Sequence, residues 1–178
     1  MITKCIFAGF GGQGILMMGH MLAYAAMKEE KHVTYLPSYG AEVRGGTAHC
    51  TVAIGDEEIA SPIASLPHFL AIMNAPSLDR FQNVLKKGGG CLINTTLVQA
   101  KTIRKDIVVF NIPASGLAEE LGDIRAANMI MLGAFLKVAQ LVKRDTVLEI
   151  IQETFADKKP EILQRNEQAL LTGYHYIP

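Results

Sequence analysis

The sequence predicts an α/β protein, a Rossmann-like three-layer sandwich in which a mostly parallel sheet carries helices on both faces. Short apolar runs alternate with longer helical stretches along the chain, which is typical of parallel sheets covered by helices. The first apolar run, residues 4–8, leads through a glycine-rich turn into a helical stretch, and the second run, residues 32–36, follows it. This order predicts a βαβ unit that crosses over right-handed between parallel strands.

Local signals predict the individual elements. Short apolar runs bounded by turn residues predict strands at residues 4–8, 32–36, 47–54, 69–73, 91–93 and 107–110, with a short strand near Ile59 and a loop at 37–46. Helices are predicted at residues 12–30, 76–87, 125–142 and 160–171. Apolar residues recur on one face of the stretch 125–142, and Pro76 suits the first turn of the stretch 76–87. A further helix is expected from Thr146, because Thr146 and Glu149 fit a capping box, and Gly173 is expected to close the last helix. No repeat or Pro/Gly-rich linker divides the chain, so residues 1–178 are interpreted as a single domain.

The charge composition excludes one class of partner and favours another. Lysine plus arginine number 17, as do aspartate plus glutamate, so the formal net charge is zero. A protein that binds nucleic acid by neutralising phosphates normally carries a basic excess, so that function is disfavoured. Charged residues make up only 19% of the chain, against about 25% in a typical soluble domain. The low charge indicates surface buried against partner subunits, although a compact monomer with few surface charges has the same composition.

Neither a membrane span nor a secretion signal is evident. The longest apolar stretches, residues 15–27 and 126–142, are interrupted by polar residues and fall short of about 18 uninterrupted apolar residues. The first residues lack the charged and apolar regions of a signal peptide. A cytoplasmic location is therefore expected.

The three cysteines do not form a metal-binding pattern. Cys5, Cys50 and Cys91 are widely spaced, and no Cys-x-x-Cys occurs, so the chain cannot supply four thiolates to an iron–sulfur cluster. All three lie in apolar runs, which favours buried small side chains over a reactive thiol. The histidines show no ligand spacing either, and no metal site is expected.

A glycine loop is the strongest local motif. The segment GFGGQG, residues 9–14, follows the first strand and opens the first helix, as in phosphate-binding turns. The first glycine permits the turn, the second lets the backbone approach a ligand, and the third lets helix pack on strand. Free N–H groups and the positive end of the helix would favour an anion.

The loop does not complete a dinucleotide-binding signature. An acidic residue is expected at the end of the second strand to hold a ribose hydroxyl, but the chain has Leu36, Pro37 and Ser38 there. NAD binding is therefore disfavoured. Packing alone, another phosphate-bearing ligand and a partner chain remain as alternatives for the glycines.

Four motifs in order resemble one protein family. They are the glycine loop, the segment SYGAEVRGGTA at residues 38–48, MNAPSL at 73–78 and ANMIMLGA at 127–134. Together they resemble the gamma subunit of the 2-oxoacid:ferredoxin oxidoreductases, most closely the 2-oxoglutarate branch. The beta subunit of indolepyruvate:ferredoxin oxidoreductase is the alternative within this family, and a stand-alone nucleotide-binding module is the alternative outside it.

The resemblance implies a reaction in a multi-subunit enzyme. A 2-oxoacid, coenzyme A and oxidised ferredoxin give an acyl-CoA, CO2 and reduced ferredoxin; for 2-oxoglutarate the product is succinyl-CoA. It implies that thiamine diphosphate, magnesium and iron–sulfur clusters belong to partner subunits: alpha, beta and, where present, a ferredoxin-like delta subunit. The isolated chain is then expected to be inactive and to contain no catalytic residue.

The resemblance also suggests which residues contact ligand or partner. The candidates are Gly9, Gly11, Gly12, Gln13, Gly14, Arg44 and Asn74. The Arg44 guanidinium would match phosphate oxygens of coenzyme A. Asn74 has two interpretations, either a cap for the following helix or a side chain in a ligand crevice. For the set as a whole, contact with coenzyme A, subunit docking alone, and neither role all stay open.

Overall fold

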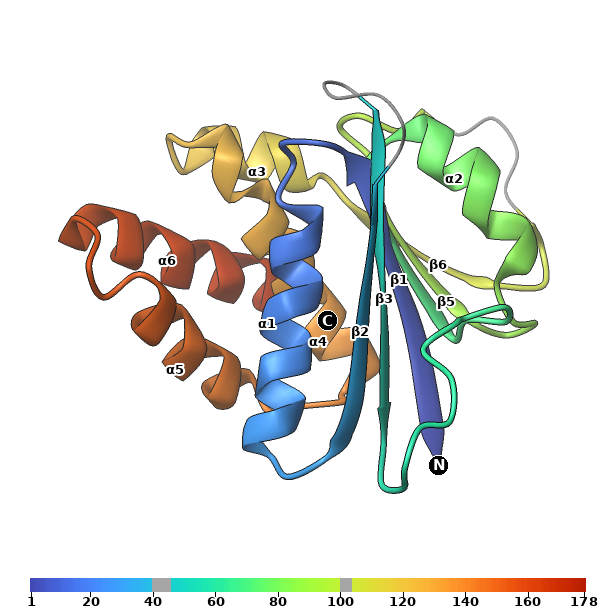
Figure 1. Cartoon of the computed structure of the whole chain (residues 1–178). Coiled ribbons are helices and arrows are strands. Elements are labelled where there is room, and N and C mark those ends of the chain that lie inside the picture. The colour runs from blue at the N-terminus through green and yellow to red at the C-terminus, as the bar shows by residue number, and fades with distance from the viewer. Residues whose placement is uncertain (40–45, 100–103) are drawn as a thin grey trace.

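The computed structural model describes residues 1–39, 46–99 and 104–178, and in these ranges the chain forms one six-stranded sheet (Figure 1). The strands are β1 (Ile2–Phe10), β2 (His32–Tyr39), β3 (Thr47–Gly55), β4 (Phe69–Ile72), β5 (Gly90–Asn94) and β6 (Val108–Ile112). Their spatial order is β2-β3-β1-β4-β5-β6. β2 and β6 are therefore the edge strands.

The sheet is parallel except for one strand. β1, β4, β5 and β6 pair in parallel, whereas β3 pairs antiparallel with both β1 and β2. Because β3 opposes both of its neighbours, β2 runs in the same direction as β1. The mostly parallel sheet is confirmed, and the expected βαβ unit connects parallel strands that have β3 between them.

The helices form two unequal layers. Their bounds are α1 (Ile15–Lys28), α2 (Ala75–Phe81), α3 (Ala114–Glu120), α4 (Ala127–Ala139), α5 (Arg144–Thr154) and α6 (Pro160–Tyr176), with short 3-10 turns η1 (Gln82–Val84) and η2 (Ile124–Ala126). In Figure 1, α2 covers one face of the sheet and the other helices cover the opposite face. The three-layer arrangement with helices on both faces is thus confirmed. No helix in the described ranges has the length and apolar character needed to cross a lipid bilayer.

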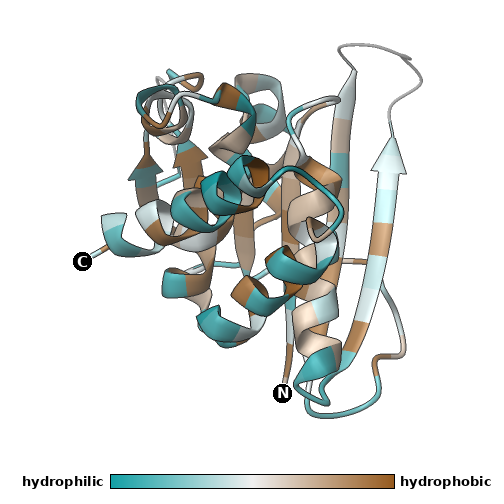
Figure 2. Ribbon diagram, turned by 90° about the vertical axis from the view of Figure 1, so that its left-hand side faces the viewer, coloured by the Kyte–Doolittle hydropathy of each residue, from teal (hydrophilic) through white to brown (hydrophobic). Residues whose placement is uncertain are grey.

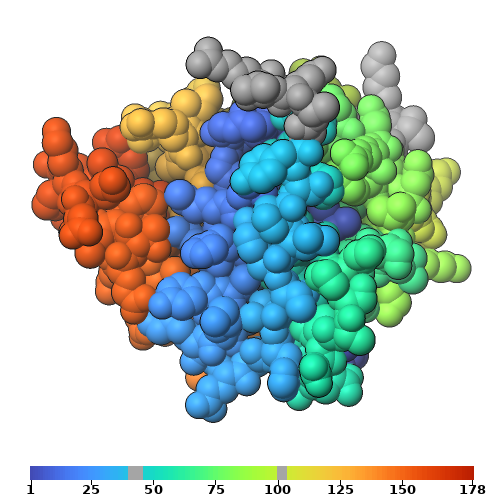
Figure 3. Space-filling view, in the orientation of Figure 1, coloured from blue at the N-terminus to red at the C-terminus, as the bar shows by residue number. Residues whose placement is uncertain are grey.

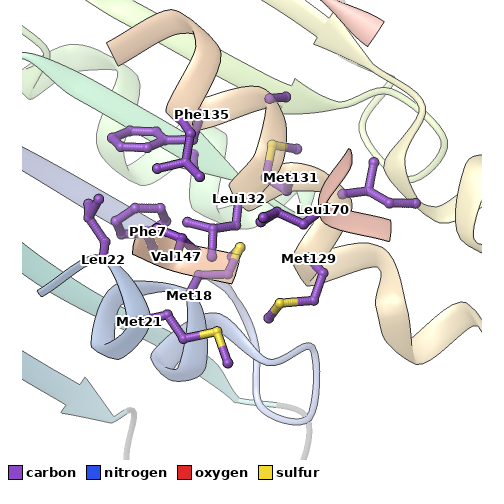
Figure 4. Packing of buried hydrophobic residues seen from close by; sticks show 14 of the residues in the cluster. Phe7, Met18, Met21, Leu22, Met129, Met131, Leu132, Phe135, Val147 and Leu170 are labelled. Carbon is purple, nitrogen blue, oxygen red and sulfur yellow. The ribbon is translucent and has the colours of Figure 1, made fainter. Parts of the chain in front are cut away.

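The core lies on both faces of the sheet because β1 alternates its side chains between them. Cys5 and Phe7 face α1 and α4, whereas Ile6 and Ala8 face α2. On the larger side the Phe7 and Phe135 rings lie 4.9 Å apart, amid methionines and leucines of α1, α4 and α6 (Figure 4). Figure 2 shows this helix layer from outside, where hydrophilic residues cover much of the outward-facing surface. The amphipathic pattern of these helices thus turns their apolar sides toward the sheet.

Two glycines allow α4 and α6 to pack at backbone contact. A Cβ on Gly173 would overlap the carbonyl oxygen of Ile130 and lie 2.6 Å from its carbonyl carbon. A Cβ on Gly133 would overlap the carbonyl oxygen of Leu170. The expectation that Gly173 ends the last helix is therefore wrong: α6 continues to Tyr176, and Gly173 is the point at which α6 crosses α4.

Several other predicted boundaries differ from the structure because tertiary contacts set them. No strand forms near Ile59; there the irregular chain is held by the Lys4 ammonium, which donates to the carbonyl oxygens of Ser61 (3.0 Å) and Ile63 (2.6 Å). β2 extends into the predicted loop as far as Tyr39, because residues 32–39 pair with β3 along their whole length.

Three helix predictions also need correction. α5 starts at Arg144 rather than at a Thr146 capping box, and the preceding N–H, that of Lys143, donates to the Glu29 carboxylate at 2.6 Å. The predicted helix 76–87 ends early, as α2 followed by η1, where the Arg104 guanidinium donates to carbonyl oxygens of the η1 turn. The predicted helix 125–142 comprises η2 and α4, and α3 has no counterpart among the predictions.

Candidate functional site

The glycine loop connects β1 to α1 at the carboxyl edge of the parallel strands. Gly14 is the N-cap of α1 and has φ +71°, a left-handed conformation that favours glycine. A Cβ on Gly14 would also lie 2.7 Å from Cγ of Asn128, which is buried on α4. The predicted packing role of the third glycine is thus seen, with α4 rather than a strand as the neighbour. Asn128 in turn donates from Nδ2 to the Gly14 carbonyl oxygen at 3.4 Å.

Gln13 ties the loop to the sheet. Its Oε1 accepts from the Phe10 N–H at 2.7 Å, and its Nε2 donates to the Met73 carbonyl oxygen at 3.3 Å. The side chain therefore links the end of β1 to the end of β4. Gly9 makes this possible, because a Cβ there would lie 2.6 Å from Gln13 Oε1 and 2.9 Å from Met73 Cβ.

The loop presents backbone N–H groups without partners. The Gly11 N–H donates to the Gly46 carbonyl oxygen at 3.0 Å, but among the described residues the N–H groups of Gly12, Gly14 and Ile15 make no hydrogen bond. Unpaired N–H groups at a helix start carry partial positive charge and attract anions. This part of the loop therefore has the backbone chemistry of an anion site.

Two hollows adjoin the loop and share Gly12 and Arg125. The larger has a volume of about 330 Å³ and is lined by Gly12, Gly14, Met17, Asp123, Arg125, Ala126, Asn128, Phe155, Ile162, Arg165 and Asn166. The smaller, of about 200 Å³, is lined by Gly12, Gln13, Met73, Leu97, Ser115, Ile124, Arg125 and Ala127. The glycine loop thus lies between two spaces large enough for parts of an organic ligand.

A carboxylate holds two arginines at the larger hollow. Asp123 accepts from Arg125 Nε and Nη2, both at 2.9 Å, and from Arg165 Nη1 at 3.1 Å. Asp123 is largely buried, whereas the Arg125 side chain is 82% exposed. Hydrogen bonds from Arg125 hold the pKa of Asp123 well below its usual range, so the carboxylate stays charged.

Sequence reasoning missed this cluster. Asp123 lies two residues before Arg125 and accepts its N–H at 3.0 Å, so the Asp-x-Arg spacing at a helix start was the available signal. Arg165 lies on another helix, 42 residues away along the chain. No local pattern connects residues that far apart.

Asn74 acts as a helix cap. Its Oδ1 accepts from the Ser77 N–H at 2.9 Å, and the residue precedes Ala75 and Pro76 at the start of α2. Asn74 Nδ2 and Ser77 Oγ are buried without a hydrogen-bond partner among the described residues. The capping interpretation is thus seen directly, while a contact between Asn74 and ligand stays a prediction.

The remaining candidates are placed as follows. Gly9, Gly11, Gly12, Gln13 and Gly14 come together in the loop, and Asn74 follows the end of β4 at the same edge of the sheet. Arg44 lies outside the described residues.

Burial raises the pKa of Cys50 and of Cys91 to about 12, so neither thiol is a ready nucleophile. The described part of the chain holds no group of three His, Cys, Asp or Glu side chains arranged for a metal ion.

The fold and the glycine loop define a Rossmann-like α/β domain, and comparison with known proteins places the chain in a particular family. The chain belongs to the pyruvate ferredoxin/flavodoxin oxidoreductase family, which it matches over residues 4–176. The resemblance to gamma subunits of 2-oxoacid:ferredoxin oxidoreductases is thereby confirmed.

Individual relatives act on different oxoacids. The ketoisovalerate oxidoreductase subunit VorA of Methanothermobacter thermautotrophicus is 38% identical over 167 residues, which cover 93% of this chain and 34% of VorA. The chain thus spans about a third of that relative. The 2-oxoglutarate synthase subunit KorC of Methanocaldococcus jannaschii is 32% identical over 170 residues, covering 94% of this chain and 89% of KorC.

A solved structure has the same fold. It is the 2-oxoglutarate:ferredoxin oxidoreductase from Magnetococcus marinus with 2-oxoglutarate, coenzyme A and succinyl-CoA bound. The TM-score is 0.91 at 22% identity, over 99% of this chain and 32% of that one. At this identity the likeness concerns the fold.

Proposed function

We propose that this chain is the gamma-type part of a multi-subunit 2-oxoacid:ferredoxin oxidoreductase, which forms an acyl-CoA, CO2 and reduced ferredoxin from a 2-oxoacid and coenzyme A. Its role is to contribute to the coenzyme A site through the glycine loop. The observation that carries the proposal is the set of N–H groups at Gly12, Gly14 and Ile15 that have no hydrogen-bond partner among the described residues, beside two hollows. We take residues 1–178 as one such domain, located in the cytoplasm.

The chemical steps belong to other parts of the complex in this proposal. Thiamine diphosphate supplies carbanion chemistry and iron–sulfur clusters carry electrons, and the described residues do not fit an iron–sulfur cluster. Cys5 and Cys50 face one side of the sheet and Cys91 the other, and all are buried. No step of the reaction is therefore assigned to side chains of this chain, which binds and positions ligand.

Contacts with partner subunits are the second part of the proposal. The surface formed by α1 and β2, which lie side by side in Figure 3, carries exposed apolar side chains. They include Met17, Tyr24 and Met27 of α1 and Leu36 of β2, which are 39 to 59% exposed. Apolar side chains gathered in this way are typical of protein interfaces. They support docking on the alpha and beta subunits.

For the oxoacid substrate we propose first a chemical class and then a particular member of that class. A 2-oxoacid is the substrate class, and 2-oxoglutarate is the member that the sequence motifs favour. The relationship to VorA supports ketoisovalerate as a second candidate, since it has the higher identity. The test is acyl-CoA formation by the complex, purified through a tag on this chain, with 2-oxoglutarate, ketoisovalerate and pyruvate in parallel. A complex that oxidises none of the three would contradict the proposal, as would turnover by the isolated chain.

Gly12 offers a test of the coenzyme A contact with a matched control. Gly12 has φ +96°, and a Cβ there would meet no atom of the described residues within 4 Å, so these residues leave room for a side chain. Asn and Asp both tolerate this conformation and have nearly the same shape. Gly12→Asp should weaken coenzyme A binding to the complex at least tenfold relative to Gly12→Asn, measured by calorimetry. Equal affinities would favour docking alone, and Arg44→Ala tests Arg44 in the same assay.

A further inference from the structure

The two arginines held by Asp123 are an unusual feature of the larger hollow. They come from separate elements, Arg125 from η2 and Arg165 from α6, yet both guanidiniums bond to one carboxylate. Two cations and one anion leave the cluster with a net positive charge. Because the carboxylate is already shared, the excess charge is available to a second anion.

Most hydrogen-bond donors of the cluster are still unused. A guanidinium has five N–H donors. Within the described residues, Arg165 uses one of its nitrogens, Nη1, and Arg125 uses Nε and Nη2. Arginine forks match phosphate oxygens in geometry and charge. The unbonded donors therefore suit a phosphate group that enters the hollow.

Beside the charged cluster, the hollow has both amide side chains, Asn128 and Asn166, and an apolar part. Met17, Phe155 and Ile162 line it together with the two arginines. Phe155 provides an aromatic side chain, on which a planar base can stack. The hollow therefore has the chemistry that suits a nucleotide: guanidinium groups for phosphate, and aromatic and aliphatic side chains for a base.

We propose that Arg125 and Arg165 bind phosphate groups of a nucleotide ligand in this hollow, and that Asp123 is the positioning residue that holds them. The inference rests on the proposed function, under which the nucleotide is coenzyme A. It deepens that function by assigning the phosphates to two arginine side chains, held by Asp123, in addition to the glycine loop.

The smaller hollow then takes the other end of the same ligand. It begins at Gly12 and Arg125, which both hollows share, and continues past Met73, Leu97 and Ile124. Leu97 and Ile124 are about half exposed, so this side is open and apolar. An uncharged, flexible pantetheine arm fits such a path better than a second charged group does.

The closing experiment compares coenzyme A with pantetheine, which lacks phosphate. Calorimetry is performed on the complex purified through this chain, as wild type, Arg125→Gln, Arg165→Gln and Lys105→Gln. Lys105→Gln is the control, because it removes the same charge from the exposed turn before β6, at the opposite edge of the sheet. The expected result is at least tenfold weaker coenzyme A binding for each arginine variant, with pantetheine affinity unchanged and the control equal to wild type.

The outcomes separate the two proposals. Wild-type affinity in both arginine variants overturns this inference and leaves the proposed function standing. No binding of coenzyme A to the wild-type complex overturns both. Loss of pantetheine affinity in the arginine variants also overturns the assignment, because it indicates a damaged fold rather than a lost phosphate contact. Thermal melting of each variant provides the independent measure of folding.

Asp123→Asn distinguishes positioning from bulk charge. Removing the carboxylate makes the cluster more positive, so simple charge attraction predicts tighter binding of an anion. If Asp123 positions the arginines, the variant instead binds coenzyme A more weakly, by at least threefold, and its affinity falls more steeply with added salt. Tighter binding by Asp123→Asn overturns the positioning role.

Discussion

The contact between α4 and α6 leads to a prediction in which two physical effects have opposite signs. Alanine is preferred to glycine inside a helix by about 1 kcal/mol, so propensity alone predicts that Gly173→Ala stabilises α6. The structure predicts the reverse. The added methyl would overlap the Ile130 carbonyl oxygen and lie 2.9 Å from Ile130 Cα. These are backbone atoms of a buried helix and cannot rotate away.

The magnitude follows from that geometry. Overpacking costs typically about 1–3 kcal/mol, and a backbone obstacle belongs at the upper end because α4 and α6 must move apart. Subtracting about 1 kcal/mol of gained propensity leaves a net loss of about 2 kcal/mol. For a chain of this length, that loss lowers Tm by about 4–8 °C.

Gly116 on α3 provides the matched control. A Cβ there would lie 3.5 Å from Thr96 Oγ1, an ordinary contact. Gly116→Ala should therefore raise Tm by about 2–4 °C, since it gains propensity without a clash. Thermal melts and urea unfolding of both variants, followed by circular dichroism, measure the difference. A Gly173→Ala variant as stable as wild type would refute the argument that backbone contact sets this helix crossing.

Three further predictions concern buried or charged groups. Because the pKa of Asp123 is lowered in the folded state, the stabilising effect of this carboxylate is present above the ordinary aspartate pKa and is lost as the pH falls below about 4. The difference in urea midpoint between wild type and Asp123→Asn should therefore shrink from pH 6 to pH 3, and a constant difference would contradict this prediction. Since the cysteines are buried and their pKa values raised, a disulfide reagent at pH 8 should react with none of Cys5, Cys50 and Cys91 until denaturant is added; rapid modification of the native chain would show otherwise. The buried Asn94 donates from Nδ2 to Ser115 Oγ at 2.8 Å and accepts at Oδ1 from the Ser115 N–H at 3.2 Å, so Asn94→Ala should lower the free energy of unfolding in urea by about 2 kcal/mol. A loss below about 0.5 kcal/mol, the size of an ordinary surface change, would argue against these bonds.

Periodicity predicted the sheet and the main helices, because burial on one or both faces imposes a repeating pattern. It could not predict the direction of β3. An apolar strand such as Thr47–Gly55 has the same residue pattern whether it pairs parallel or antiparallel with its neighbours. Only the short connection from β2 favours a hairpin. α3 was missed because Ser115 and Gly116 are weak helix formers, and the helix is held by tertiary bonds from Asn94 and Thr96.

The candidate site was predictable only where its residues are close together in the sequence. The spacing of the glycines within six residues determines the conformation of the turn, so the position of the loop could be predicted from the sequence. The role of Gln13 as a link to Met73 could not, because its partner lies 60 residues away. The same holds for Arg165 and Asp123, which meet only after α6 has folded back onto η2.

The insertion of β3 between β1 and β2 also fixes which nucleotides the fold can discriminate. In a dinucleotide-binding domain the second strand adjoins the first, and an acid at its tip reaches the adenosine ribose. Here the tip of β2 is two strand spacings from β1, roughly 10 Å away. Placing an aspartate at Tyr39, the last residue of β2, would thus create a carboxylate too distant to recognise that sugar. Conversion of this scaffold into an NAD-dependent one would require a change of strand order, which point substitutions cannot supply.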